Sequence, residues 1–238
     1  MHPTAMMNAQ NFFDCYSKNF LVGEMEKVKV IEIGSQDVNG SIRDKCPQDF
    51  EYIGVDFVEG KGVDLILDDP YRLPFDTGYA DIVVSSSCFE HSEMFWVLFL
   101  EIVRILKPRG LLYLNVPSNG EFHRYPVDCW RFYPDSGRAL ISWAKRNGIN
   151  AALLESYTST QIGDRWNDLD QWNDFVAVFL KDENFISTFP NRIIDSKEDF
   201  SNGLIYNNND FFNYGPMPED KKKILAISQI ISNQIKVK

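Results

Sequence analysis

Residues 28–41 read VKVIEIGSQDVNGS, and this stretch decides the fold of the chain. Its first part is rich in β-branched residues and lacks glycine and proline, which predicts a buried strand. Glu32 lies near the carboxyl end of that strand, Gly34 ends it, and Ser41 is placed to cap a following helix. Ligands of doubly wound α/β proteins bind outside the carboxyl ends of the strands. We therefore expect a ligand site at the turn that contains Gly34.

The loop after Gly34 is poor in glycine and carries a negative charge. A dinucleotide site needs the pattern Gly-x-Gly-x-x-Gly, because pyrophosphate binds bare backbone N–H groups at a helix amino terminus. Here Gln36 stands near the place of the second glycine, and Asp37 lies where a phosphate would bind. Such a loop favours a ligand with ammonium and sulfonium groups and no phosphate, such as S-adenosylmethionine. Taken alone, the loop is also compatible with an ordinary strand–turn–helix.

Two further predicted strands support an adenosine ligand. Residues 52–56 form a short strand ending in Asp56, about 20 residues beyond the glycine turn, where an acidic side chain binds ribose hydroxyls. Residues 63–67 form a third strand and lead into DDPYRLPF at 68–75. This segment resembles class I S-adenosylmethionine-dependent methyltransferases, in which an acidic residue before Leu-Pro-Phe contacts the adenine amino group. The resemblance implies that role for Asp69, although Pro70 offers the ring no N–H, so that Tyr71 or a water would replace it.

The resemblance covers residues 28–118. A fourth strand at 80–86 is followed by EH at 90–91, a helix at 93–106, KPRG at 107–110 and a fifth strand at 110–116. The resemblance implies a doubly wound α/β fold with a seven-stranded, mostly parallel sheet, in which strands 151–157 and 174–180 form an antiparallel pair. Helices are expected at 8–22, over the cofactor or on the sheet edge, and at 135–147. We assign to the cofactor Glu32, Gly34, Ser35, Asp37, Gly40, Asp56, Phe57, Asp69, Tyr71 and Ser87.

The loop at 117–134, PSNGEFHRYPVDCWRFYP, leaves the fifth strand toward the predicted cofactor cleft. Together with the glycine turn, it resembles a methyltransferase subgroup associated with bacterial surface-polysaccharide and glycan biosynthesis. Histidine titrates near neutrality, so we expect His123 to act as a base or substrate ligand, with Asp128 orienting it and His91 as the alternative base. The nearby acids are compatible with a divalent metal, but no ligand spacing calls for one. The predicted substrate contacts are Arg124, Tyr125, Arg131 and Trp166.

Some of these assignments have structural alternatives. Arg124, Tyr125, Asp128 and Arg131 are equally suited to an internal ion-pair lattice that holds the loop. Trp166 belongs to an acidic loop at 163–170, which is interpreted as a substrate lid.

Composition excludes several classes of protein. A net charge of −10 and a pI near 4.8 argue against a nucleic-acid partner, which needs clustered Lys and Arg. No apolar run reaches the ~18 residues of a membrane span, and the amino terminus lacks the pattern of a signal peptide. Four cysteines without metal or disulfide spacing indicate reduced thiols and a cytoplasmic protein.

The chain divides into a predicted methyltransferase domain, residues 1–180, and an asparagine-rich arm with a terminal helix, residues 181–238. That helix is expected to start at Pro218, and Ile224, Ile227, Ile231 and Ile235 form an apolar stripe along it. The stripe either packs on its own domain or makes a homodimer contact.

The predicted activity is transfer of a methyl group from S-adenosylmethionine to a small-molecule or glycan acceptor, at a sugar hydroxyl. The alternatives are a catalytically silent cofactor-binding scaffold and a nicotinamide-dependent oxidoreductase, which the acidic loop disfavours.

Overall fold

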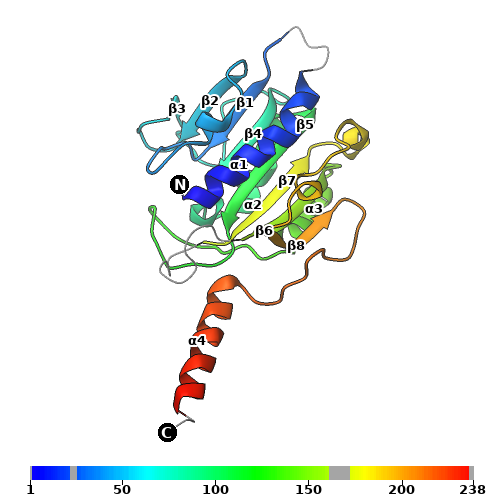
Figure 1. Cartoon of the computed structure of the whole chain (residues 1–238). Coiled ribbons are helices and arrows are strands. Elements are labelled where there is room, and N and C mark those ends of the chain that lie inside the picture. Colours follow the sequence, from blue (N-terminus) through cyan, green and yellow to red (C-terminus); the bar gives the residue numbers. More distant parts are fainter. Residues whose placement is uncertain (1, 22–25, 161–171, 236–238) are drawn as a thin grey trace.

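A computed structural model describes residues 2–21, 26–160 and 172–235. Its centre is an eight-stranded sheet with the order β3-β2-β1-β4-β5-β7-β6-β8 (Figure 1). The first five strands are parallel, β7 runs antiparallel to β5 and β6, and β8 runs antiparallel to β6. The strands are β1 (Lys29–Ile33), β2 (Glu51–Asp56), β3 (Leu65–Ile66), β4 (Ala80–Ser86), β5 (Leu106–Pro117), β6 (Ala152–Ser159), β7 (Asp174–Leu180) and β8 (Phe200–Ile205). The predicted fold class is confirmed, with one strand more than expected.

Helices cover both faces of the sheet. Helix α1 (Pro3–Tyr16) lies across one face, and α2 (Phe95–Ile105) and α3 (Ser136–Arg146) lie on the other (Figure 1). Successive side chains of β5 point to opposite faces of the sheet and pack on different helices. The Tyr113 ring lies 4.8 Å from that of Phe12 in α1, whereas Leu112 belongs to the core that includes Phe99 of α2. Strands that are buried on both faces explain the continuous apolar runs of the sequence.

Several element boundaries differ from those predicted. Helix α1 begins earlier than residue 8, because Pro3 occupies the first turn, where its missing N–H is not needed. It ends at Tyr16 and continues as the 3-10 helix η1 (Ser17–Phe20). After β1 there is only a short 3-10 helix, η2 (Ile42–Lys45), which Ser41 caps by accepting a hydrogen bond from the Arg43 N–H at 3.2 Å.

Helix α2 ends at Ile105, and strand β5 begins at Leu106 and not at the predicted residue 110. Leu106 pairs with Ala80 and Leu111 with Ile82, and the shift in register between these pairs absorbs the extra residues, among them Pro108. A proline is tolerated at such an irregularity because no ladder hydrogen bond is required of it.

The arm beyond residue 180 completes the sheet instead of forming a separate layer. It contains the 3-10 helices η4 (Glu183–Thr188) and η5 (Ile193–Asp195) before β8. The buried carboxylate of Glu155 on β6 accepts hydrogen bonds from the N–H groups of Ile193 at 2.8 Å and Ile194 at 3.1 Å, and a third from Tyr16. This carboxylate therefore ties α1 and the arm to the sheet.

Helix α4 (Glu219–Ile235) stands apart from the sheet (Figure 1). Ile224, Ile227 and Ile231 are 66%, 41% and 50% exposed. The described part of the domain does not cover them, and the two alternatives for this stripe, internal packing and a homodimer contact, stay predictions. Among the described residues, no helix has both the length and the apolar character needed to cross a bilayer.

Candidate active site

The carboxyl ends of three central strands lie next to one another. Ile33 of β1 pairs with Val55 of β2 and Ser85 of β4, so the residues that follow each strand emerge at one edge of the sheet. The N–H groups of Gly34 and Ser35 both donate to the Val55 carbonyl, at 3.0 and 3.1 Å, which fixes the turn after β1. The predicted ligand edge is thus assembled from Gly34, Asp56 and Ser86.

Glycine is required at the first of these turns. Gly34 has a φ of +78°, a conformation that side chains disfavour, and a Cβ built on it would lie 2.7 Å from the Cβ of Cys88. The backbone here therefore approaches the segment after β4 more closely than any other residue type would allow.

Two buried carboxyl groups at this edge differ in their surroundings. Asp56 accepts hydrogen bonds from Gln36 N–H at 3.2 Å and Phe57 N–H at 2.8 Å, and the Phe57 side chain beside it is exposed. Glu32 is 2% exposed and accepts the Tyr52 hydroxyl at 2.8 Å. Burial raises the pKa of Glu32 to about 8, and the Tyr52 hydrogen bond opposes this shift. Glu32 is therefore held away from water, and its ligand role stays a prediction.

Other predicted cofactor residues make contacts within their own loop or with the next one. Asp37 accepts the Gly40 N–H at 2.7 Å and pairs with Lys61 at 2.5 Å, and the Lys61 hydrogen bond lowers its pKa. Asp69 accepts the Tyr71 N–H at 2.8 Å. The roles of these residues toward a ligand stay predictions.

A second group of polar residues forms where two loops meet beyond β4 and β5. The 3-10 helix η3 (Phe89–His91) follows β4, and the loop after β5 folds back on it, because the N–H groups of Cys129 and Trp130 donate to the Glu90 carbonyl at 2.7 and 3.2 Å. Ser87, with a φ of +51°, turns the chain between β4 and η3, and its N–H donates to the Asn115 carbonyl at 2.9 Å.

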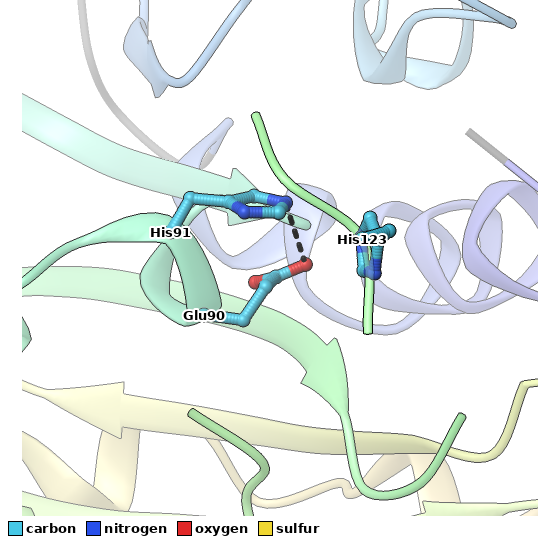
Figure 2. A group of neighbouring side chains, drawn as sticks. All are labelled: Glu90, His91 and His123. Atoms are coloured by element: carbon cyan, nitrogen blue, oxygen red, sulfur yellow. Dashed lines mark ion pairs between the residues drawn. The ribbon is translucent and has the colours of Figure 1, made fainter. Parts of the chain in front are cut away.

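Both candidate bases, His91 and His123, lie in this group (Figure 2). Their rings meet edge to face with centroids 4.9 Å apart. Nδ1 of His91 is 2.5 Å from the Val127 carbonyl oxygen, and its Nε2 is 3.8 Å from Oε1 of Glu90. Burial raises the pKa of Glu90 to about 8 and lowers that of His91.

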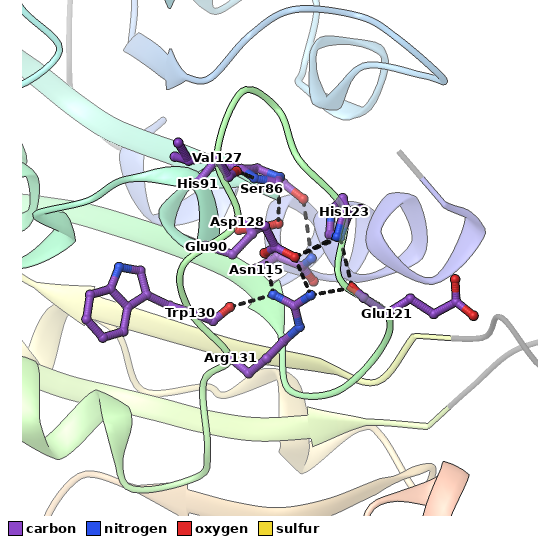
Figure 3. A network of polar contacts seen from close by, with 10 residues as sticks. All are labelled: Ser86, Glu90, His91, Asn115, Glu121, His123, Val127, Asp128, Trp130 and Arg131. Atoms are coloured by element: carbon purple, nitrogen blue, oxygen red, sulfur yellow. Dashed lines mark hydrogen bonds and ion pairs between the residues drawn. The ribbon is translucent and has the colours of Figure 1, made fainter.

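Asp128 holds the loop that carries His123 (Figure 3). It accepts the His123 N–H at 2.7 Å, lies 3.5 Å from Nδ1 of that ring, and receives two hydrogen bonds from Arg131 at 2.6 and 2.8 Å. Burial opposes ionisation of Asp128, but these hydrogen bonds outweigh it and lower its pKa to about 2. Asp128 and Arg131 therefore form part of the internal lattice considered above. Arg124 and Tyr125 are exposed, but Nε of Arg124 donates to the Pro126 carbonyl at 3.1 Å and the Tyr125 ring lies 6.4 Å from that of His91. Trp166 lies outside the described residues.

Sequence reasoning missed several residues around this group. Asn115, a polar residue in an apolar strand, donates to the Ser86 hydroxyl at 3.3 Å (Figure 3) and accepts from Asn8 of α1 at 3.0 Å. Its polarity was a usable signal. The Trp172 ring lies 4.9 Å from that of His123, and His2 pairs with Asp174 at 2.8 Å. No spacing indicates these contacts, because they join distant parts of the chain.

Comparison with known proteins identifies the domain. Residues 19–114, about two fifths of the chain, match the family described as a methyltransferase domain. The chain contains a methyltransferase domain. The match runs from the end of α1 into β5 and so includes the turns at Gly34, Asp56 and Ser87. No curated protein matches the chain in sequence.

Several solved structures share the fold of this domain. One is the 1,6-didemethyltoxoflavin-N1-methyltransferase of Burkholderia thailandensis, solved with 1,6-didemethyltoxoflavin and S-adenosylhomocysteine. It is 13% identical, has a TM-score of 0.52, and the match covers 75% of this chain and 79% of that one. The YcgJ protein of Bacillus subtilis is also 13% identical, with a TM-score of 0.50 and coverage of 76% and 100%. Likeness at this level of identity establishes the fold.

The residues at the edge of the methyltransferase domain fit an adenosyl cofactor. The Ser35 hydroxyl is buried and has no hydrogen-bond partner among the described residues, so it remains available to a ligand. The Asp56 carboxylate is a hydrogen-bond acceptor of the kind that ribose hydroxyls need, and the exposed Phe57 ring offers an apolar surface to a base. No phosphate-binding glycine pattern is present in the turn.

Proposed function

We propose that this methyltransferase methylates a hydroxyl group of a small-molecule or glycan-type acceptor. The cofactor is S-adenosylmethionine, and the related toxoflavin methyltransferase was solved with the demethylated form of that cofactor. When bound, it supplies an electrophilic methyl group on a positively charged sulfur. The observation that carries the proposal is the histidine pair, His91 and His123, in the loops that follow β4 and β5.

The residues at the strand ends would hold the cofactor. Asp56 would bind the ribose hydroxyls, and Ser35 would contribute the hydroxyl that lacks a partner among the described residues. Gly34 allows the close approach of backbone that such a turn needs.

His123 is suited to take the proton from the acceptor. Its Nδ1 is 3.2 Å from the Glu121 carbonyl oxygen, which accepts an N–H there and leaves a lone pair on Nε2. Asp128 binds the backbone of the same residue and is itself held by Arg131. A hydroxyl is a weak nucleophile, so a positioned base would assist its attack.

The aromatic residues of the same loop support a ring-shaped acceptor. Phe122, Tyr125 and Tyr133 are 75%, 55% and 62% exposed, close in sequence to His123. The Tyr125 ring lies 6.4 Å from that of His91, and exposed apolar side chains beside a polar site are typical of ligand-binding surfaces. Together with the loop's resemblance to the polysaccharide subgroup, these aromatic residues favour a glycan acceptor. The cytoplasmic location stays a prediction from the sequence.

The acceptor can be tested directly. The full chain is incubated with methyl-labelled S-adenosylmethionine and a panel of sugar nucleotides and oligosaccharides, and products are mapped by mass spectrometry. We expect labelled methyl ethers. Products labelled only on nitrogen or carbon would contradict the proposal. Stabilisation by S-adenosylhomocysteine without turnover of any acceptor would favour a silent cofactor-binding module.

The role of His123 is tested by substitution. His123→Ala should lower turnover by ~10²–10⁴, the range typical of a lost general base, while the affinity for S-adenosylhomocysteine stays nearly unchanged. If His91→Ala shows this loss and His123→Ala does not, the two histidines exchange roles. Full activity in both variants would mean that alignment of the substrates alone drives the reaction.

A further inference from the structure

We propose that Glu90, His91 and His123 bind a divalent transition-metal ion. One donor atom from each of the three side chains lies within 4.8 Å of the others (Figure 2). They come from two separate segments, η3 and the loop after β5, which the backbone bonds to the Glu90 carbonyl hold together. A small movement of the loop would let all three donor atoms lie ~2.0–2.2 Å from one central ion, the distance at which imidazole and carboxylate ligands bind such ions.

Each histidine is oriented as a metal ligand usually is. Ligating imidazoles donate their second N–H to a carbonyl or carboxylate, which fixes the ring and frees the other nitrogen for the ion. Nδ1 of His91 has the Val127 carbonyl at 2.5 Å, and Nδ1 of His123 has the Glu121 carbonyl at 3.2 Å and Asp128 at 3.5 Å. In both rings the free nitrogen is therefore Nε2.

The carboxylate supplies an independent indication of a ligand. Glu90 is 1% exposed, and its Oε2 has no hydrogen-bond partner among the described residues. A buried polar atom without a partner destabilises the fold unless something binds it. A cation coordinated by this carboxylate would satisfy it.

The donor set indicates which ions fit. Two imidazoles and one carboxylate suit zinc, iron, cobalt or manganese, whereas magnesium prefers oxygen ligands alone. Three protein ligands leave coordination positions open, and an acceptor oxygen could occupy one of them. This consequence rests on the proposed function. With an ion bound, both imidazoles would be ligands, so neither could act as the base. The ion would instead promote loss of the proton of a coordinated hydroxyl to solvent water.

Metal binding can be measured without cofactor or acceptor. Zn²⁺ is titrated into the chelator-treated full chain by calorimetry, and we expect one equivalent to bind. Glu90→Gln, His91→Ala and His123→Ala should each weaken the affinity by at least about tenfold. His2→Gln is the matched control, because the third histidine of the chain pairs with Asp174 and lies outside the donor set. This variant should bind Zn²⁺ as the wild type does.

A second metal distinguishes this site from the cysteines. Co²⁺ bound by nitrogen and oxygen ligands shows weak visible bands without the thiolate charge-transfer absorption expected if the exposed Cys129 were a ligand. Melting curves and S-adenosylhomocysteine binding confirm that each variant is folded. If Glu90→Gln unfolds, the two histidine variants and the Co²⁺ spectrum decide.

The inference is overturned if the wild type binds no Zn²⁺ at millimolar concentration, if the ligand variants bind it unchanged, or if thiolate absorption dominates. If the wild type binds Zn²⁺ as expected but methylates no hydroxyl of the acceptor panel, only the proposed function is overturned.

Discussion

Glu32 is a carboxylic acid removed from water next to the cofactor edge, and its proton makes the stability of the fold depend on pH. Burial raises its pKa from 4.5 to about 8. Between these values the folded chain keeps a proton that the unfolded chain releases, so unfolding becomes easier as pH rises. Glu32→Gln removes this dependence. As pH rises through this window, from 4.5 to about 8, the unfolding free energy of the variant should increase relative to that of the wild type by up to about 1.4 kcal/mol per pH unit.

Denaturant titrations at several pH values in this range measure the difference. Wild-type and variant curves that run parallel with pH would contradict the raised pKa. A gain that appears only below the lower limit of the window would reverse the sign and point to a depressed pKa.

The turn after β1 determines how closely two elements approach. At Gly34 a side chain would meet both a positive φ of +78° and the Cβ of Cys88 at 2.7 Å. At Gly78, in the turn before β4, the φ is +76° and a Cβ would meet nothing within 4 Å. Gly78→Ala should therefore destabilise by the backbone strain alone, ~1 kcal/mol. Gly34→Ala should add ~1–3 kcal/mol for the clash and weaken S-adenosylhomocysteine binding.

The two glycine variants form a matched pair, measured by thermal unfolding and by ligand titration. Equal losses of stability would show that the segment at Cys88 yields without strain. Unchanged ligand affinity in Gly34→Ala would move the cofactor away from this turn.

Among the described helices and strands, the terminal helix α4 has the least contact with the others. Ile224 and Ile231 of this helix are half or more exposed, so removal of the helix should not expose apolar surface that is buried in the domain. A chain truncated after residue 217 is therefore expected to keep the melting temperature of the full chain at low protein concentration. A buried isoleucine contributes ~1.5–3 kcal/mol, so internal packing of several would make the loss easy to detect.

Light scattering on both chains separates the alternatives. If truncation lowers the melting temperature but leaves the oligomeric state unchanged, the helix packs on its own domain in solution. A fall that accompanies a change from dimer to monomer would show that a second copy covers the stripe.

The sequence by itself determined the central sheet and its ligand edge. β-branched runs such as that of β1, and the turn at Gly34, depend on neighbours within a few residues, so local patterns predict them. The methyltransferase domain was implied by the resemblance of residues 28–118 to that family. Strand β8 escaped prediction because its segment, FSNGLI, contains polar residues and a glycine and gains its stability from pairing with β6.

Only the tertiary structure decided how the polar groups combine. Glu90 was one acid among many in the sequence, and it became a candidate ligand because the loop after β5 folds back on η3 and brings His123 to it. For Glu32, predicted from the sequence to contact a ligand, the fold adds a hydrogen bond from the Tyr52 hydroxyl and a burial that raises its pKa. Such pairings join residues far apart in the chain, and their energy depends on burial and strand register, which no local pattern contains.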